Sequence, residues 1–99
     1  MIIVIGSIFA KSDKVQDILA LSLRHVKRSQ KEVGCISHNL SLDCEDPLRL
    51  VFVENWVDMA ALQAHFSLAA SQQFVQDITP LLSEKPQMKI YQASEMPGE

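Results

Sequence analysis

The sequence is poor in the residues that build several common kinds of site. It has only three glycines, two cysteines and one tryptophan in 99 residues. So few glycines leave little material for a backbone loop that cradles phosphate, and the chain has no G-x-S-x-G, Gly-rich or C-x-x-C motif. The sequence therefore gives no support to a nucleotide-binding loop, a serine-esterase elbow or a C-x-x-C redox or zinc module.

Excess positive charge and long apolar runs are also absent. Nine lysines and arginines face twelve aspartates and glutamates, for a formal net charge of −3, so no basic stripe is available for nucleic acid. No apolar run approaches the roughly 20 residues that a membrane-spanning helix needs. The apolar start, MIIVIGSIFA, lacks the basic region of a signal peptide and is better interpreted as a strand. We expect neither nucleic acid nor a membrane as partner.

The two cysteines are not placed for an internal disulfide. Cys35 and Cys44 lie nine positions apart, and a strand of that length spans about 30 Å. Two free thiols are typical of a reducing compartment, which predicts a cytoplasmic protein.

Hydrophobic periodicity predicts a single α+β domain over residues 1–94 and a disordered tail over 95–99. Strands are expected where apolar residues run together or alternate, and helices where they recur every three to four residues. Ser12, Asp58 and Ser71 are the predicted helix N-caps. The predicted elements are a strand 2–9, a helix of about five turns from Ser12 to Gly34, strands 35–42 and 48–56, short helices from Asp58 and from Ser71 through Leu82, and a strand 87–93 after Pro86.

The order β-α-β-β-α-β is the ferredoxin-like pattern, a four-stranded antiparallel sheet with helices over one face. Such a sheet should have a polar second face, yet the first and third strands are apolar on both sides. Large exposed apolar patches mark interfaces. We therefore expect a homodimer in which two sheets pack face to face.

A family resemblance rests on Glu54–Asp58 and Ala61–Phe66, preceded by Glu32–Cys35 and the turn Asp46–Pro47. These residues resemble the antibiotic biosynthesis monooxygenase domain family, and the likeness extends over residues 2–93. The resemblance implies a dimeric α+β barrel, in agreement with the partner that the two-sided strands require. It does not fix one reaction.

Branches of that family differ in the residues that this chain can match. The cofactor-free oxygenases of anthrones and quinols resemble it at Trp56, but Phe52 and Leu62 stand where they carry an asparagine and a tyrosine. The haem-degrading branch would place its histidine ligand at Val75, so haem is not expected. A third branch, of small quinol oxidases and of isomerases of phosphorylated sugars, keeps a histidine that resembles His65. No cofactor is predicted.

His65 is the predicted catalytic residue. It borders the apolar stripe of the helix after Asp58 and should be partly buried. It is either a hydrogen-bonded structural histidine or a general base toward a substrate, since imidazole exchanges a proton near neutral pH.

Trp56, Asn55, His38 and Ser22 are the predicted substrate-binding residues. Trp56 is either a packing anchor or a flat wall for an aromatic ligand. Asn55 points to the opposite side of the strand, so the two line one pocket only if the strand is bulged or ending. His38 is a core or a pocket residue, and Ser22 leaves room for a ligand or for close helix packing.

The remaining polar candidates favour structural roles. Glu54 shares the apolar side of its strand and needs a partner, because a buried unpaired carboxylate is costly. His25 is expected to be solvated. His25, His38 and His65 have no H-x-x-x-H spacing, so no metal site is predicted.

The leading hypothesis is a cofactor-independent monooxygenase of a small quinol, phenol or anthrone-like substrate, with His65 as the base. An isomerase or binding module for a small polar metabolite, phosphorylated ones included, and a non-catalytic dimeric domain are the alternatives. A fold alone does not choose among them.

Overall fold

The computed structural model describes residues 1–98 and has the predicted ferredoxin-like order, with the second helix divided in two. The sheet is antiparallel throughout, in the order β2-β3-β1-β4. Asp58 caps α2 as predicted, because its Oδ1 accepts the Ala61 N–H at 2.9 Å. The elements are β1 (Ile2–Phe9), α1 (Val15–Ser29), β2 (Cys35–Asp43), β3 (Asp46–Trp56), α2 (Met59–Ser67), α3 (Ala69–Ile78), the 3₁₀ turn η1 (Thr79–Leu81) and β4 (Gln87–Gln92).

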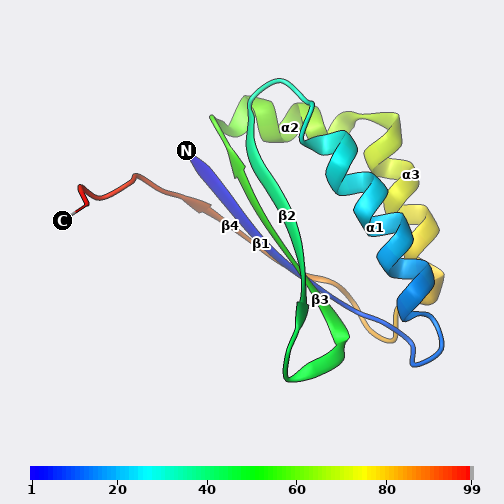
Figure 1. Cartoon of the computed structure of the whole chain (residues 1–99). Coiled ribbons are helices and arrows are strands. Elements are labelled where there is room, and N and C mark those ends of the chain that lie inside the picture. The colour runs from blue at the N-terminus through cyan, green and yellow to red at the C-terminus, as the bar shows by residue number, and fades with distance from the viewer. Residues whose placement is uncertain (99) are drawn as a thin grey trace.

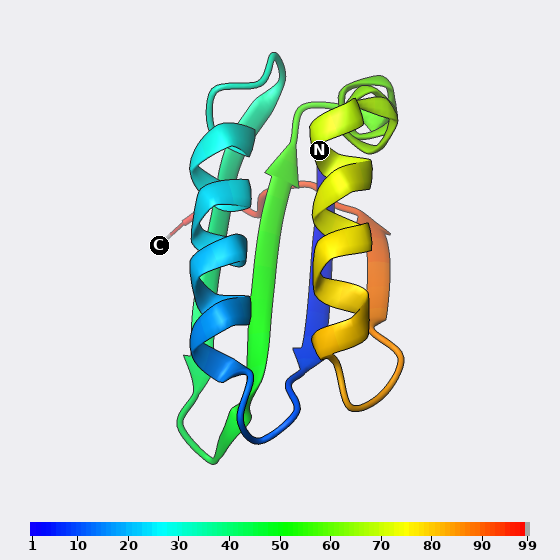
Figure 2. The same ribbon diagram turned by 90° about the vertical axis from the view of Figure 1, so that its right-hand side faces the viewer.

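The molecule has two layers, with every helix on one side of the sheet (Figure 1). Figure 2 shows α1 lying over β2 and β3, and α3 lying over β1. Alternation along β3 explains the layering, because Leu50, Phe52, Glu54 and Trp56 all point to the helices and are buried, whereas Val53 is exposed on the far face. The far face carries no element of the described chain.

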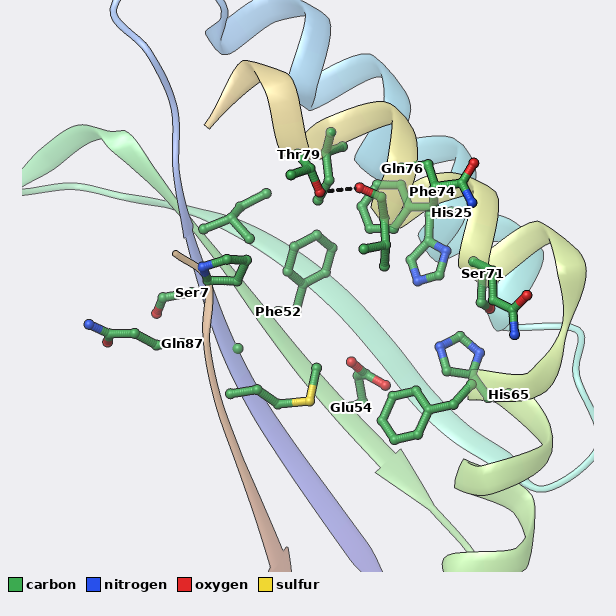
Figure 3. A pocket seen from close by; sticks show the side chains of 18 residues that line it. Ser7, His25, Phe52, Glu54, His65, Ser71, Phe74, Gln76, Thr79 and Gln87 are labelled. Atoms are coloured by element: carbon green, nitrogen blue, oxygen red, sulfur yellow. Dashed lines mark hydrogen bonds between the residues drawn. The ribbon is translucent and has the colours of Figure 1, made fainter. Parts of the chain in front are cut away.

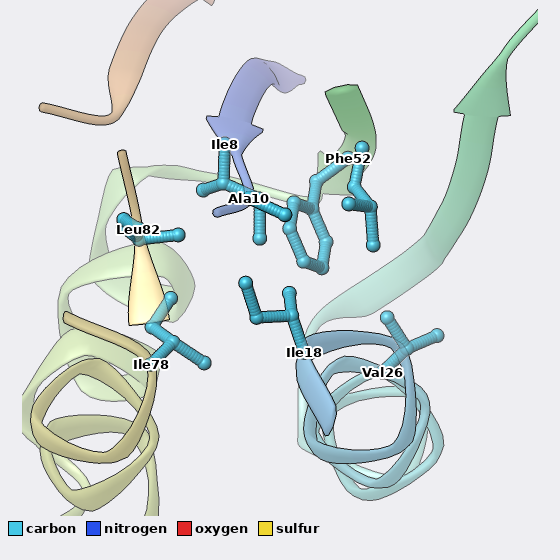
Figure 4. Packing of buried hydrophobic residues seen from close by; sticks show 8 residues of the cluster. Ile8, Ala10, Ile18, Val26, Phe52, Ile78 and Leu82 are labelled. Atoms are coloured by element: carbon cyan, nitrogen blue, oxygen red, sulfur yellow. The ribbon is translucent and has the colours of Figure 1, made fainter. Parts of the chain in front are cut away.

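Two apolar clusters stabilise the helix–sheet interface. The larger one joins β1, α1, β3 and the end of α3, and its members are Ile8, Ala10, Ile18, Val26, Leu50, Phe52, Ile78 and Leu82 (Figure 4). The smaller one gathers Ile2, Val4, Trp56 and Leu62. Phe52 and Trp56 lie in different clusters, so Glu54, between them on the same face of β3, lies where the apolar packing is interrupted.

Two predicted helix starts are wrong. Ser12 lies in a turn, and α1 begins at Val15 with Lys14 as its N-cap and no side-chain cap, so it is shorter than the predicted five turns. Ser71 is not a cap but a buried residue inside α3, which begins at Ala69. In both places backbone hydrogen bonds from the preceding turn, such as Lys14 N–H to the Lys11 carbonyl at 2.9 Å, set the first helical residue.

Gly34 does not end α1, whose C-cap is Gln30. It forms the turn into β2 with φ of +84°, a left-handed conformation that favours glycine. A Cβ at this position would lie 2.5 Å from the Cβ of Ala61. The Gly34 carbonyl accepts the Val57 N–H at 2.9 Å, which ties this turn to the start of α2.

Apolar and polar residues alternate from Ile36 to Leu42 in the sequence, which predicts Ile36 on the same side of β2 as His38, and this is wrong. The strand register shifts between Cys35 and Ser37, so this β-bulge removes Ile36 from the alternation and leaves it exposed. His38 stays on the helix side and is almost fully buried.

The last strand follows Pro86 as predicted and ends at Gln92. Residues 95–98 have no regular secondary structure and are exposed. The final residue of the predicted tail, residue 99, lies outside the described residues. No helix within residues 1–98 combines the length and the apolar character needed to cross a bilayer.

Candidate functional site

A cavity of about 570 Å³ opens between the sheet and the helices. Residues of β1, β3, α1, α2, α3 and the segment entering β4 line it, among them Phe52, Glu54, His25, His65 and Phe74 (Figure 3). Its volume lies in the range of small-molecule sites. The cavity therefore lies where several elements meet, and not on one loop.

Most of the cavity wall is apolar. Aromatic rings dominate one part of it, and Phe52 meets Phe74 edge to face with centroids 6.2 Å apart. No lysine or arginine is among the lining residues. The other apolar members are Ile8, Phe66, Val75, Ile78, Pro86 and Met88. Such a wall suits a flat, uncharged or weakly polar ligand.

His65 presents an imidazole to this cavity in a fixed orientation. Its Nδ1 lies 2.7 Å from Oε1 of Glu32, a residue of the turn between α1 and β2. The carboxylate can only accept, so in the neutral imidazole Nδ1 carries the proton and Nε2 has the free lone pair. The indole of Trp56 packs beside the ring, with centroids 4.7 Å apart. The imidazole is only 3% exposed.

Glu54 is a buried carboxyl group with an ordered environment. Its Oε1 accepts the Trp56 Nε1–H at 3.0 Å and lies 3.3 Å from Nε2 of His38. Burial raises the pKa of Glu54, although the Trp56 hydrogen bond and nearby His65 oppose the shift. His38 is not the cationic half of an ion pair, because burial, and then His65, lower its pKa to about 4.

His25 is also buried in the helix–sheet interface. Its ring stacks on Phe74 with centroids 4.1 Å apart, and its Nδ1 lies 3.1 Å from Nη2 of Arg28, which must be the donor. Burial is the main cause that lowers the pKa of His25 to about 3, followed by His38, His65 and Arg28. The ring is therefore neutral at physiological pH.

The three histidines form one cluster. One ring nitrogen from each of His25, His38 and His65 lies within 4.8 Å of the others. The rings come from α1, β2 and α2, so the cluster exists only in the folded chain. Among the described residues, these are the ones that could hold a metal ion.

Comparison with known proteins identifies the family. The model of the antibiotic biosynthesis monooxygenase family matches residues 1–77. The chain belongs to the antibiotic biosynthesis monooxygenase family.

Solved structures of similar proteins share this fold over most of their length. A crystal structure of an antibiotic biosynthesis monooxygenase is 27% identical, with a TM-score of 0.89 over 96% of this chain and 100% of that one. A Shewanella oneidensis protein is 29% identical, with a TM-score of 0.85 over 91% and 87% of the two chains. A Deinococcus radiodurans protein, 21% identical with a TM-score of 0.94 over 100% and 98%, shows likeness of fold alone.

A curated relative is similar in sequence but has no described activity. This uncharacterized protein of Synechocystis sp. is 35% identical over 94 residues, which is 95% of this chain. The chain spans only 64% of that relative's length. These similarities establish the family and do not specify the reaction.

In this family member, the predicted site residues are distributed over four environments. His65 lines the cavity, whereas Trp56 and His38 lie behind the lining, within 6.3 Å of one another by ring centroid. Asn55 lies on the far face of the sheet, where its Nδ2 donates to Oγ of Ser37 at 2.7 Å. Ser22 is buried in α1 and does not line the cavity.

Two polar residues of the cavity were expected to be structural or solvated. Glu54 lines the cavity, and its position in an apolar row of β3 was the signal in the sequence. The prediction that His25 is solvated is wrong, since it is buried and lines the cavity. Its place next to Val26 on α1 gave little indication, because His25 is covered by residues of β2, α2 and α3 that are distant in the sequence.

Proposed function

We propose that this protein is a cofactor-independent monooxygenase that oxidises a small phenol, quinol or anthrone-like substrate in the cavity. One observation carries the proposal: an imidazole with a fixed tautomer, that of His65, borders an otherwise largely apolar cavity. Membership of the antibiotic biosynthesis monooxygenase family supports the same class of reaction.

His65 is the proposed base. Because Glu32 holds the proton on Nδ1, the free Nε2 accepts a proton from a phenolic hydroxyl or an activated C–H of the substrate. An anion of this kind is electron-rich, and the apolar wall keeps it away from water. The Glu32 carboxylate stabilises the imidazolium that results.

The substrate supplies the electrons for oxygen. An anthrone-like CH2 loses a proton to His65, its carbanion adds O2, and reprotonation gives a hydroperoxide. Loss of water from that hydroperoxide leaves a carbonyl. One oxygen atom ends in the product and one in water, so CH2 + O2 gives C=O + H2O and the atoms and electrons balance.

Glu54 and Trp56 are proposed to assist His65. Burial raises the pKa of Glu54, which favours a neutral carboxyl group able to donate a hydrogen bond to a substrate oxygen. Trp56 fixes the Glu54 carboxyl by its Nε1–H and packs against the His65 ring. It is therefore a positioning residue behind the cavity.

The cavity gives less support to the alternatives. A phosphorylated metabolite would need cationic or backbone donors, and no lysine or arginine lines the cavity. A non-catalytic domain would not need a carboxylate-oriented histidine beside an apolar cavity. We therefore favour the oxidation of an aromatic substrate.

Oxygen uptake with a panel of quinols, phenols and anthrones tests this function, in the presence of a chelator. Wild type should consume O2 with at least one member above background, and His65→Ala should lose about 100-fold or more of that rate. Gln72→Ala is the matched control, since Gln72 lines the cavity and is exposed. Uptake at background level by wild type across the panel, or equal rates for wild type and His65→Ala, would overturn the proposal.

We also propose that two copies pair through the open face of the sheet. Ile5, Val53 and Tyr91 are exposed on that face, on three adjacent strands. Strand β1 is hydrogen-bonded on both edges, so only its face remains to be covered. A second copy with the same apolar face is the proposed partner.

A further inference from the structure

We propose that His25, His38 and His65 form a binding site for one divalent transition-metal ion. The three imidazoles come from α1, β2 and α2, and a ring nitrogen of each lies within 4.8 Å of the others. Three histidines with an open fourth position are a common protein ligand set for zinc and related ions. The inference does not rest on the proposed oxygenase function, and an ion would compete with the substrate proton for the same Nε2 of His65.

The spacing of the rings fits a shared ion. Their centroids are 5.4, 5.2 and 5.7 Å apart, for the pairs His25–His38, His25–His65 and His38–His65. Three imidazoles bonded at about 2.1 Å to one tetrahedral ion hold their ring centres about 5 Å apart. Rotation of the rings, with little movement of the backbone, would therefore bring the three nitrogens to one ion.

His38 supplies a second, independent observation. Its side chain is fully buried, and within residues 1–98 neither Nδ1 nor Nε2 has a hydrogen-bond partner. The 3.3 Å approach of Nε2 to Oε1 of Glu54 lacks the geometry of a hydrogen bond. Buried polar atoms without a partner are uncommon and costly, and a metal ion would satisfy one of these nitrogens.

His65 has the orientation of a metal-bound histidine. Ligand imidazoles commonly donate their other ring N–H to a carboxylate, which fixes the tautomer. The 2.7 Å contact between His65 Nδ1 and Glu32 Oε1 has this form and leaves Nε2 for an ion. His25 and His65 both line the cavity, so water or a small ligand can reach the fourth position.

Arg28 is the group that opposes an ion here. Its guanidinium donates to Nδ1 of His25 at 3.1 Å, so the ring proton is on Nε2. An ion can bind Nδ1 only if Arg28 moves away from it. An ion can bind Nε2 only if the proton moves from Nε2 to Nδ1, which also requires Arg28 to move away. Arg28 is exposed, so its side chain can turn into solvent.

Co²⁺ titration of the chelator-treated, full-length protein tests the site. We expect visible absorption typical of a low-coordinate Co²⁺, saturating at one ion per chain. Replacing any one of the three histidines by glutamine should weaken binding about 100-fold or more, and Glu32→Gln about 10- to 100-fold. Arg28→Met should tighten binding, and Glu45→Gln, at an exposed carboxylate in the β2–β3 turn, should leave it unchanged.

Three outcomes would overturn the proposal: no saturable binding at millimolar Co²⁺, the same affinity in all three histidine variants, or weaker binding by Arg28→Met. If a histidine variant fails to fold, as judged by circular dichroism, Arg28→Met and Glu32→Gln still decide the result. The readout is absorption, so it is separate from oxygen uptake. If the protein binds Co²⁺ as expected but consumes no oxygen in the chelator-containing assay, that result would count against the oxygenase function alone.

Discussion

Nδ1 of His65 donates a 2.7 Å hydrogen bond to Oε1 of Glu32, although the two residues are 33 positions apart in the sequence. Glu32 lies in the turn after α1, whereas His65 lies near the end of α2. Both proposals for the cavity depend on this contact, because it selects the nitrogen that His65 presents. Its removal is therefore the most informative substitution at the site.

In Glu32→Gln, the side chain at position 32 should no longer determine which ring nitrogen of His65 carries the proton. The amide can donate as well as accept, so Nδ1–H is no longer enforced. We expect the slowly exchanging Nδ1–H signal of His65 in proton NMR to disappear, and oxygen uptake to fall at least about tenfold. Glu45→Gln, at an exposed carboxylate in the β2–β3 turn, is the control. A retained N–H signal in Glu32→Gln would show that the carboxylate does not set the tautomer.

Glu54 should tolerate an amide but not truncation. Glu54→Ala leaves the buried Trp56 Nε1–H without its acceptor, which should cost about 1–3 kcal/mol of unfolding free energy. Glu54→Gln keeps a carbonyl oxygen for that hydrogen bond and adds no charge.

The pH dependence of stability distinguishes these variants further. Burial raises the pKa of Glu54 in the folded state, so the folded chain binds the proton more tightly than the unfolded chain. The stabilising contribution is complete at low pH and is lost as pH rises from the unfolded value of 4.5 through the raised folded value. In urea denaturation between pH 4 and 7, the unfolding free energy of wild type relative to Glu54→Gln should therefore fall as pH rises. Parallel curves would contradict it.

His25 and His38 should make the chelated protein acid-sensitive. Their pKa values are lowered from 6.5 to about 3 and about 4, so the unfolded chain binds protons below pH 6.5 that the folded chain does not. Stability should fall as pH decreases from 6.5 toward 4, by up to about 1.4 kcal/mol per pH unit for each histidine. His25→Phe keeps a ring against Phe74 and should remove the contribution of His25 to the pH dependence of the unfolding free energy, measured by urea denaturation. An unchanged slope would contradict the buried, neutral state of His25.

Gly34→Ala should destabilise the fold at the turn that positions α2. The substitution places a Cβ in a left-handed conformation and 2.5 Å from the Cβ of Ala61, at a cost of about 2–4 kcal/mol. Gly98→Ala, where no heavy atom lies within 4 Å of the added Cβ, is the matched control. Thermal unfolding should separate the two, and equal midpoints would show that the turn adapts.

Val53→Asp should prevent the proposed pairing of sheets. A charge on the exposed face of β3 would be buried against an apolar partner, which is costly without a counter-charge. Light scattering should give a dimer mass for wild type and a monomer mass for Val53→Asp at the same concentration. The exposed hairpin variant Glu45→Gln again serves as control. A monomer mass for wild type would refute the dimer.

Periodicity in the sequence predicted most of the fold. Alternation along β3 and the apolar run of β1 determined which side chains point inward, and Asp58 is an N-cap that the sequence identified. The helix starts at Ser12 and Ser71 were wrong, because a capping residue type does not show where the backbone enters a helix. Ile36 was misplaced because a bulge is not visible in an alternating pattern.

The sequence by itself determined the family and the two-layer architecture, since both depend on local periodicity and on the residues around Trp56. Tertiary structure alone decided the site. His25, His38 and His65 are far apart in the sequence and have no spacing typical of metal ligands. Packing of α1 and α2 on the sheet nevertheless brings one ring nitrogen of each within 4.8 Å of the others. Burial then keeps His25 and His38 neutral, and the hydrogen bond to Glu32 orients His65. These are consequences of desolvation and three-dimensional proximity, which a linear pattern does not contain.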